Sequence, residues 1–187
     1  MATSPKSGEK TPDQQQLPAQ KAQREPQDAA YARAQDAIAT ARTSDASDLT
    51  LSGDDFSDLT ELPPDIGTLT ALTDLSLSGT QVSDISALSG LTALNRLYLS
   101  GTPVSDISAL SGLTALSGLS LLGTPVNDLS PILPLTQLVD APKYGGLAFR
   151  NTAAARADRR IAEIAGIQDD AKRATDLCAY LKNVTPT

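Results

Sequence analysis

Three consecutive stretches of the chain repeat almost the same 22 residues, at 69–90, 91–112 and 113–134. The first reads LTALTDLSLSGTQVSDISALSG, the second differs from it at four positions, and the third follows the pattern more loosely. A period of this length is typical of solenoids, in which each repeat buries its apolar face only by stacking on its neighbours. Each copy therefore predicts one coil, made of a short strand, a tight turn and a return, which is the irregular or 3₁₀ segment that leads back to the next strand.

The apolar residues of the copies follow one pattern, L-x-x-L-x-L-x-x-T-x-V. This pattern resembles leucine-rich-repeat proteins, especially the short bacterial type whose repeat contains the turn GTxVSD. Thr stands where that family usually has Asn. The resemblance implies an α/β repeat fold, a leucine-rich-repeat solenoid with a short parallel β-sheet on its concave face and an irregular or 3₁₀ convex side. The residues that carry it are Leu72, Leu75, Leu77, Thr80, Val82, Leu94, Leu97, Leu99, Thr102, Val104, Leu116, Leu119, Leu121, Thr124 and Val126.

The chain divides into four predicted parts. Residues 1–27 are rich in Pro, Gln, Ser, Lys and Glu and poor in large apolar side chains, which predicts a disordered polar tail. Residues 28–45 form a predicted N-terminal capping helix, and residues 46–141 a solenoid in which degenerate repeats flank the three regular ones. Residues 142–187 form a predicted C-terminal helical cap, because the ends of a solenoid have to be covered.

The two caps are predicted from apolar residues at helical spacing. In the C-terminal part, one helix is expected from about 153 to 165 and a second from about Asp169. The N-terminal helix presents Tyr31, Ala34, Ile38 and Ala41 on one face, and the last helix presents Ala171, Ala174, Leu177, Cys178 and Leu181. We interpret Cys178 as a packing residue, because it lies on this apolar face.

Composition excludes several kinds of catalytic and metal site. The chain has no His, one Cys and no Trp, so catalytic triads and His-containing metal centres are excluded. The adjacent carboxylate pairs Asp54–Asp55 and Asp169–Asp170 diverge on a strand or a helix, which argues against catalysis by carboxylates. We therefore expect no enzyme activity, no cofactor and no metal. Each return begins with an Asp that is expected to cap the following turn rather than to build a calcium row, at Asp84, Asp106 and Asp128.

The charge is distributed unevenly along the chain. Residues 46–140 carry eleven acidic side chains and one basic side chain, Arg96. Such an acidic body repels phosphate backbones and favours a basic protein or peptide partner, so nucleic acid is not expected. No stretch of about 18 apolar residues predicts a membrane span, and the N-terminus has no apolar core of a signal peptide. We expect a cytoplasmic monomer that does not bind membranes; the alternative is secretion without a cleavable signal peptide.

The differences between the copies indicate where a partner binds. Copies one and two differ at Thr73/Asn95, Asp74/Arg96, Ser76/Tyr98 and Gln81/Pro103. Most of these positions lie on or beside the strand and face the concave side, although drift at exposed positions gives the same pattern. Tyr and Arg are also common at the centre of interfaces. The candidate partner-binding residues are Asp74, Ser76, Ser78, Arg96, Tyr98, Ser100, Ser120 and Leu122.

These observations favour a non-catalytic protein–protein interaction module that binds a protein or peptide through its concave face. The alternative function is a secreted bacterial effector that engages a host protein, with the polar tail as its export signal. Five short strands give a concave face of about 300 Å², whereas a standard stable interface buries about 800 Å² on each partner. Loops or caps must therefore share the contact. Arg96 has a simpler alternative role, because it can pair with Asp74 across the sheet.

Overall fold

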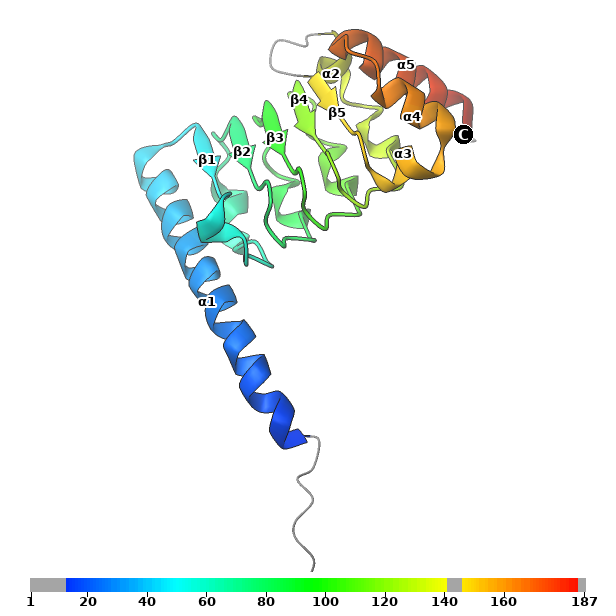
Figure 1. The fold of residues 1–187 in the computed structure, drawn as a ribbon. Coiled ribbons are helices and arrows are strands. Elements are labelled where there is room, and N and C mark those ends of the chain that lie inside the picture. The colour runs from blue at the N-terminus through cyan, green and yellow to red at the C-terminus, as the bar shows by residue number, and fades with distance from the viewer. Residues whose placement is uncertain (1–12, 141–145, 185–187) are drawn as a thin grey trace, which may run out of the picture.

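The computed structural model describes residues 13–140 and 146–184. Its central feature is a five-stranded parallel sheet in which the strands follow one another in chain order, as Figure 1 shows. A sheet of this kind arises when each coil places its strand beside the strand of the previous coil. The strands are β1 (Asp48–Thr50), β2 (Asp74–Ser76), β3 (Arg96–Tyr98), β4 (Gly118–Ser120) and β5 (Gly146–Ala148).

The middle residue of every strand is a leucine that points into the coil. The register aligns Leu49, Leu75, Leu97, Leu119 and Leu147 in one row across the sheet. All five are buried, and the predicted second row is buried beside them at Leu77, Leu99 and Leu121. The predicted inward stacking of the repeated leucines is therefore confirmed.

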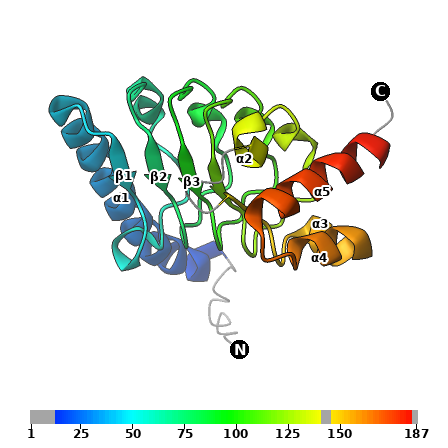
Figure 2. The same ribbon diagram turned by 90° about the horizontal axis from the view of Figure 1, so that it is seen from above.

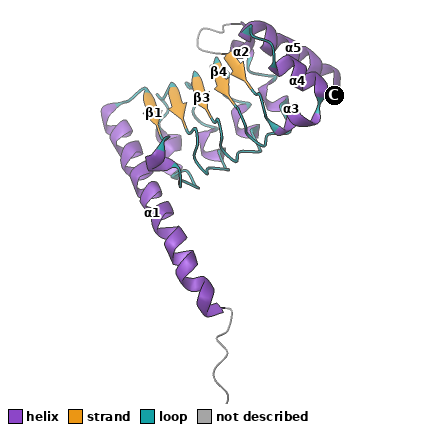
Figure 3. Cartoon of the chain, in the orientation of Figure 1, coloured by secondary structure: helices purple, strands orange, loops and turns teal. Residues whose placement is uncertain are grey.

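The return of each coil contains a short 3₁₀ helix, so that strands and 3₁₀ turns occupy opposite sides of the solenoid (Figure 3). The carboxylates of Asp84, Asp106 and Asp128 each accept a hydrogen bond of 2.8 Å from the backbone N–H two residues later. This confirms the predicted capping role of these residues. The 3₁₀ helices are η1 (Asp54–Phe56), η2 (Pro64–Thr68), η3 (Ser86–Leu88), η4 (Ser108–Leu110) and η5 (Ser130–Ile132).

The threonines that stand where the family usually has Asn form a buried row. In the three regular copies the hydroxyls of Thr80, Thr102 and Thr124 each donate a 2.8 Å hydrogen bond to the carbonyl three residues earlier. Their backbone N–H groups bond to the same carbonyls. Gly101 precedes the central threonine at a φ of 70°, a conformation that non-glycine residues rarely adopt. The Gly-Thr turn of each regular copy is thus closed by the side chain of its own threonine.

The N-terminal end of the solenoid is covered by α1 (Asp13–Ser44). Its face of Ala30, Ala34, Ile38 and Ala41 is buried against the first coil. The predicted helical face is therefore confirmed, except that Ala30 is buried where Tyr31 was expected and Tyr31 is only partly buried. The Arg33 side chain adds two hydrogen bonds to the Asp55 carbonyl, at 3.0 and 2.7 Å.

The helix α1 begins earlier than the sequence predicted. It starts at Asp13, within the stretch 1–27 that was expected to be disordered, and its first half extends beyond the repeats in Figure 1. The Gln, Ala, Lys, Arg and Glu residues of this stretch are good helix formers, which explains the longer helix. The expected tail at residues 1–12 lies outside the described residues.

The solenoid ends later than the predicted boundary at residue 141. Strand β5 (Gly146–Ala148) pairs with β4 in the same parallel register as the other strands. In the third regular copy, Leu116 and the strand residue Leu119 are three positions apart. In the last coil, α2 (Thr136–Asp140) and the segment after it separate Leu138 from the strand residue Leu147, so the repeat spacing did not predict β5. The predicted C-terminal cap at 142–187 therefore contains the last strand of the sheet.

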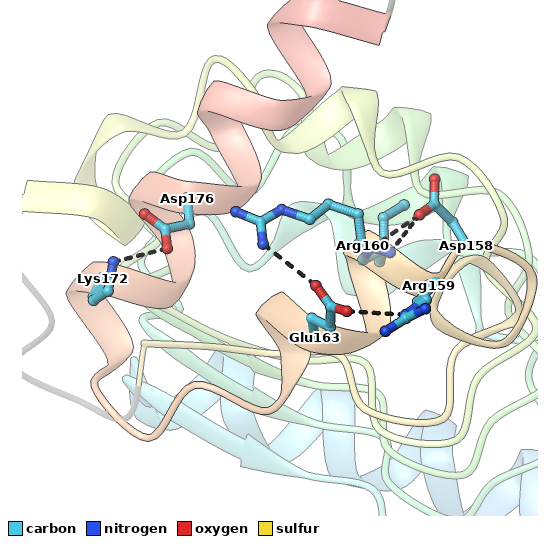
Figure 4. Close-up of polar contacts among 7 residues, drawn as sticks. Asp158, Arg159, Arg160, Glu163, Lys172 and Asp176 are labelled. Carbon is cyan, nitrogen blue, oxygen red and sulfur yellow. Dashed lines mark hydrogen bonds and ion pairs between the residues drawn. The ribbon is translucent and has the colours of Figure 1, made fainter.

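Three helices cover the C-terminal end, as the view from above in Figure 2 shows. They are α3 (Ala153–Ala157), α4 (Arg159–Ala165) and α5 (Asp170–Val184). The first two replace the single helix expected over 153–165, because Asp158 has an extended backbone and its carboxylate caps α4 through the N–H groups of Arg160 and Ile161. In Figure 4, Glu163 lies between Arg159 and Arg160 and bonds to both, while Lys172 bonds to Asp176 on α5.

Two arginines fix this cap to the last strand. Arg173 is buried on α5, where the sequence analysis had placed Ala171 on the apolar face, and it donates to the Leu147 carbonyl at 2.6 Å. It also pairs with Asp170. Arg150 donates to the Ala165 carbonyl at 3.1 Å. An unpaired carbonyl at the edge of a sheet can accept a hydrogen bond from a strand of another chain. Arg173 bonds to the Leu147 carbonyl, so this carbonyl of β5 is not available for such pairing.

Among the described residues, no helix is long and apolar enough to cross a membrane.

Candidate protein-binding surface

The concave face of the sheet is built from the residues that flank the buried leucines. The register places Asp48, Asp74 and Arg96 side by side on β1, β2 and β3. The row two residues further along each strand contains Thr50, Ser76 and Tyr98 in the same order, and continues with Ser120 on β4. The alternation of strand residues thus directs these side chains away from the core.

Arg96 is held across the sheet by Asp74. Its Nε pairs with one carboxylate oxygen of Asp74, and the other oxygen accepts a 2.8 Å hydrogen bond from the Thr73 hydroxyl. The same hydroxyl lies 3.0 Å from the Ser47 carbonyl on the neighbouring coil. The pairing that the sequence analysis gave as the simpler role of Arg96 therefore exists, and it fixes the guanidinium group at the centre of the face.

Two large apolar side chains of the second and third regular copies are exposed. Tyr98 is 38% exposed and Leu122 is 40% exposed, and the other exposed large apolar residue in the described part of the chain is Val184, at the end of α5. Leu122 follows β4, and its carbonyl accepts the N–H of Gly101 from the neighbouring coil. Both residues thus lie on or beside the sheet.

A shallow depression of about 370 Å³ lies over the first three strands. It brings together four of the predicted residues, Asp74, Ser76, Arg96 and Tyr98. The other four, Ser78, Ser100, Ser120 and Leu122, do not line it. Ser100 and Ser120 instead share a hydrogen bond of 2.7 Å beside it.

The sequence analysis missed the contribution of the first coil. Ser47, Asp48, Leu49 and Thr50 also line the depression. A signal for them was present, because the letters DLT at 48–50 match DLS at 74–76 and therefore align in the sheet. The candidate residues were drawn from the three regular copies alone, so the concave residues of this degenerate coil were left out.

No arrangement typical of a metal site accompanies this surface. No group of three or more His, Cys, Asp or Glu side chains suited to a metal ion occurs within residues 13–140 and 146–184. Asp170 pairs with Arg173, and Asp169 accepts the N–H of Lys172 at the start of α5. Burial raises the pKa of the Cys178 thiol despite the opposing effect of nearby Lys182, as for a packing cysteine rather than a nucleophile.

The repeated sequence, the parallel sheet in chain order and the buried leucine rows together identify the fold. The chain has the fold of leucine-rich-repeat proteins. Its row of Thr in place of Asn is a variation within that fold, because the hydroxyl still satisfies the carbonyl at the turn.

Comparisons with known proteins returned solved structures only. No model of a protein family and no curated protein matches the chain. An internalin (inlF) from Listeria monocytogenes is 32% identical over 58% of this chain, with a TM-score of 0.48. Internalin C2 of the same organism is 37% identical over 44% of the chain, with a TM-score of 0.39. A leucine-rich-repeat protein of Leptospira interrogans is 22% identical over 55%, with a TM-score of 0.41.

The chain spans only part of the structures that it matches. The matches cover 28%, 40% and 29% of the inlF, internalin C2 and Leptospira chains, respectively.

Proposed function

We propose that this leucine-rich-repeat protein is a non-catalytic interaction module that binds a protein or peptide through its concave face. Arg96 and Tyr98 form the centre of the proposed contact. The observation that carries the proposal is the exposure of Tyr98 and Leu122 on or beside the sheet, at 38% and 40%. When a partner covers an exposed apolar side chain, the free energy of the system falls.

The differences between the coils support the same surface. The residues that build the coil are repeated from copy to copy. The position that Tyr98 occupies in its coil is occupied by Ser76 in the previous coil and by Ser120 in the next. A framework without partners would fold equally well with Ser at all three positions. The large aromatic side chain is therefore better explained by recognition, since Tyr gives a large contact area at a low cost in conformational entropy.

The ion pair prepares Arg96 for binding. Asp74 and Thr73 hold the guanidinium group in one place, so a partner that bonds to it does not have to order a freely rotating side chain. The depression is also lined by the polar residues Asp48, Thr50 and Ser76 and by Leu49 and Leu75. Tyr and Arg are residues that often contribute most to the binding energy of an interface.

The test is a titration against a partner captured with the intact protein and identified. Tyr98→Ser restores the residue that the neighbouring coils carry, and Arg96→Ala removes the guanidinium group. We expect each variant to weaken binding by about tenfold or more, as central Tyr and Arg residues do, with an unchanged thermal midpoint for Tyr98→Ser. Calorimetric titration gives the affinity, and circular dichroism gives the midpoint.

Asn127→Ala serves as the control, because Asn127 is exposed on the return side of the third regular coil. It should leave the affinity unchanged. If both Tyr98→Ser and Arg96→Ala bind as tightly as the parent protein, the concave face is not the binding surface and the proposal is wrong.

A further inference from the structure

A groove lies on the return side of the solenoid, between the first and second coils. The first coil reads TELPPDIG where the second reads SDISALSG, so that it carries one more residue between its buried apolar positions Leu62 and Ile66. Pro63 and Pro64 occupy this longer stretch. The regular copies carry no such insertion, so the first two coils differ in shape at the groove.

The groove has a volume of about 750 Å³, which is larger than the 370 Å³ depression on the concave face. Thr60, Glu61, Leu62 and Pro64 line one side of it, and Asp84 and Ala87 line the other. Carboxylates and apolar surface thus occur in the same groove. It shares no lining residue with the concave depression.

The walls of the groove are held in place by contacts between the two coils. Gln81 donates its backbone N–H to the Leu59 carbonyl at 2.9 Å. Near η2 the coils touch, because a Cβ on Gly67 would lie only 3.0 Å from the Ala87 carbonyl oxygen. The groove is therefore bounded by two fixed contacts and is present without any rearrangement.

The groove carries negative charge on its walls and no basic residue among the described residues that line it. No Lys or Arg is among its lining residues, and the chain has none between Arg42 and Arg96. The Ser86 backbone N–H bonds to the Asp84 carboxylate at 2.8 Å and lowers its pKa, so this group is ionised at neutral pH. Glu61 takes the same place in the first coil that Asp84 takes in the second, and its side chain is exposed.

We propose that this groove binds a basic segment of a partner protein, with an arginine or lysine head group between Glu61 and Asp84 and its aliphatic stem on Leu62, Pro64 and Ala87. Long basic side chains have this dual character, since their stems pack on apolar surface while their charge stays near water. The charge of the groove and its apolar walls match the two halves of such a side chain. The site is separate from the proposed concave surface.

The experiment is a nuclear magnetic resonance titration of the full chain with acetyl-arginine amide. Acetyl-citrulline amide is the matched probe, because it has the same shape without the charge. We expect the arginine compound to shift the amide signals of Glu61, Ser86 and Ala87, and the citrulline compound to shift them much less. The double variant Glu61→Gln/Asp84→Asn should weaken binding of the arginine compound by about fivefold or more, as the loss of two exposed charge contacts implies.

Asp106→Asn is the matched control, because Asp106 makes the same 2.8 Å cap in the next coil and does not line the groove. It should leave the arginine titration unchanged. Asn keeps an oxygen that can accept the capping hydrogen bond. If the double variant nevertheless has a lower melting temperature than the parent protein, Glu61→Gln alone repeats the test. Three results would each overturn the proposal: no shifts at the groove, equal shifts with citrulline, or equal weakening by Asp106→Asn. None of them affects the concave-face proposal, which depends on Tyr98 and Arg96.

Discussion

The regular coils at 69–134 and the coils at the two ends of the solenoid bury the same leucine row by different means. In the regular coils the bonds that close each turn are local, as between Thr102 and the Leu99 carbonyl. At the ends the bonds join segments far apart in the sequence, as between Arg173 and the Leu147 carbonyl. The turns of the middle coils are thus closed by the same local bond in every copy, whereas the ends also depend on specific partners elsewhere in the chain.

The strongest test of this difference removes one end. Deletion of residues 151–187 takes away all three C-terminal helices and leaves the buried Leu147 and Phe149 without cover. We expect the truncated protein to aggregate or to unfold without cooperativity, because a repeat array needs polar ends. Size-exclusion chromatography and thermal melting would measure this. A truncated protein that is as soluble as the parent and unfolds as sharply would show that the helices are a separate appendage.

The second test, with a smaller expected effect, compares one threonine of the regular coils with its equivalent in the last coil. Thr102 and Thr152 are both buried and both bond to the carbonyl three residues earlier, at 2.8 and 3.0 Å. Thr152 also accepts the Ala155 N–H at 3.1 Å, which caps α3. We expect Thr102→Val to lower the free energy of unfolding by about 1 kcal/mol and Thr152→Val by about 2 kcal/mol.

Urea unfolding of the two valine variants measures the difference. An equal loss for both variants would mean that the end of the solenoid gains nothing from the added cap. A larger loss for Thr102→Val would reverse the comparison between the middle and the end.

The sequence predicted the middle of the molecule better than its ends, for a physical reason. The leucine rows, the parallel strands and the caps at Asp84, Asp106 and Asp128 depend on residues within one or two coils, so the repeat itself encodes them. Strand β5 could not be found in this way, because the insertion after Leu138 breaks the spacing.

The buried Arg173 was also missed, because its partners Leu147 and Ile167 lie outside its own helix and nothing in the local pattern indicates them. Of the candidate site, the pairing of Asp74 with Arg96 could be read from the repeat alignment. The part contributed by Asp48 could also have been read from the match of DLT at 48–50 to DLS at 74–76, but the candidate residues were taken from the regular copies alone. Whether these residues bind a partner stays a prediction.

The capping carboxylates predict a further, smaller effect of pH on the regular coils. Backbone hydrogen bonds from Ser86 and Ser108 lower the pKa of Asp84 and Asp106 below the ordinary 3.8. A carboxyl whose pKa is lowered by folding stabilises the fold above its unfolded pKa, and this contribution is lost as the pH falls through the folded pKa. The melting temperature should therefore fall below about pH 4, and Asp106→Asn should make this fall shallower.

Melting curves from pH 7 to pH 2 check the expected fall. Asn accepts the same hydrogen bond without titrating, so the variant should match the parent protein most closely at the lowest pH. A fall of the same steepness in Asp106→Asn would show that this cap does not contribute to the acid sensitivity.

The smallest effect is expected at the other end of the chain. Deletion of residues 1–27 removes the half of α1 that extends beyond the repeats and keeps the buried face from Ala30 to Ala41. The thermal midpoint should stay nearly the same, since the deleted stretch contains few large apolar side chains. A drop of several degrees would show that it packs on the solenoid. A secretion assay on the same truncated protein tests the alternative that this stretch is an export signal.

The central claim is that the coils repeat a framework and use the concave face for recognition. The most direct measurement places a photo-cross-linking phenylalanine analogue at Tyr98 or, as the comparison, at the exposed Asn127 on the return side, in the intact protein inside its native cell. We predict a discrete cross-linked partner from position 98 and none from position 127. The same partner from both positions, or a partner from position 127 alone, would contradict the claim.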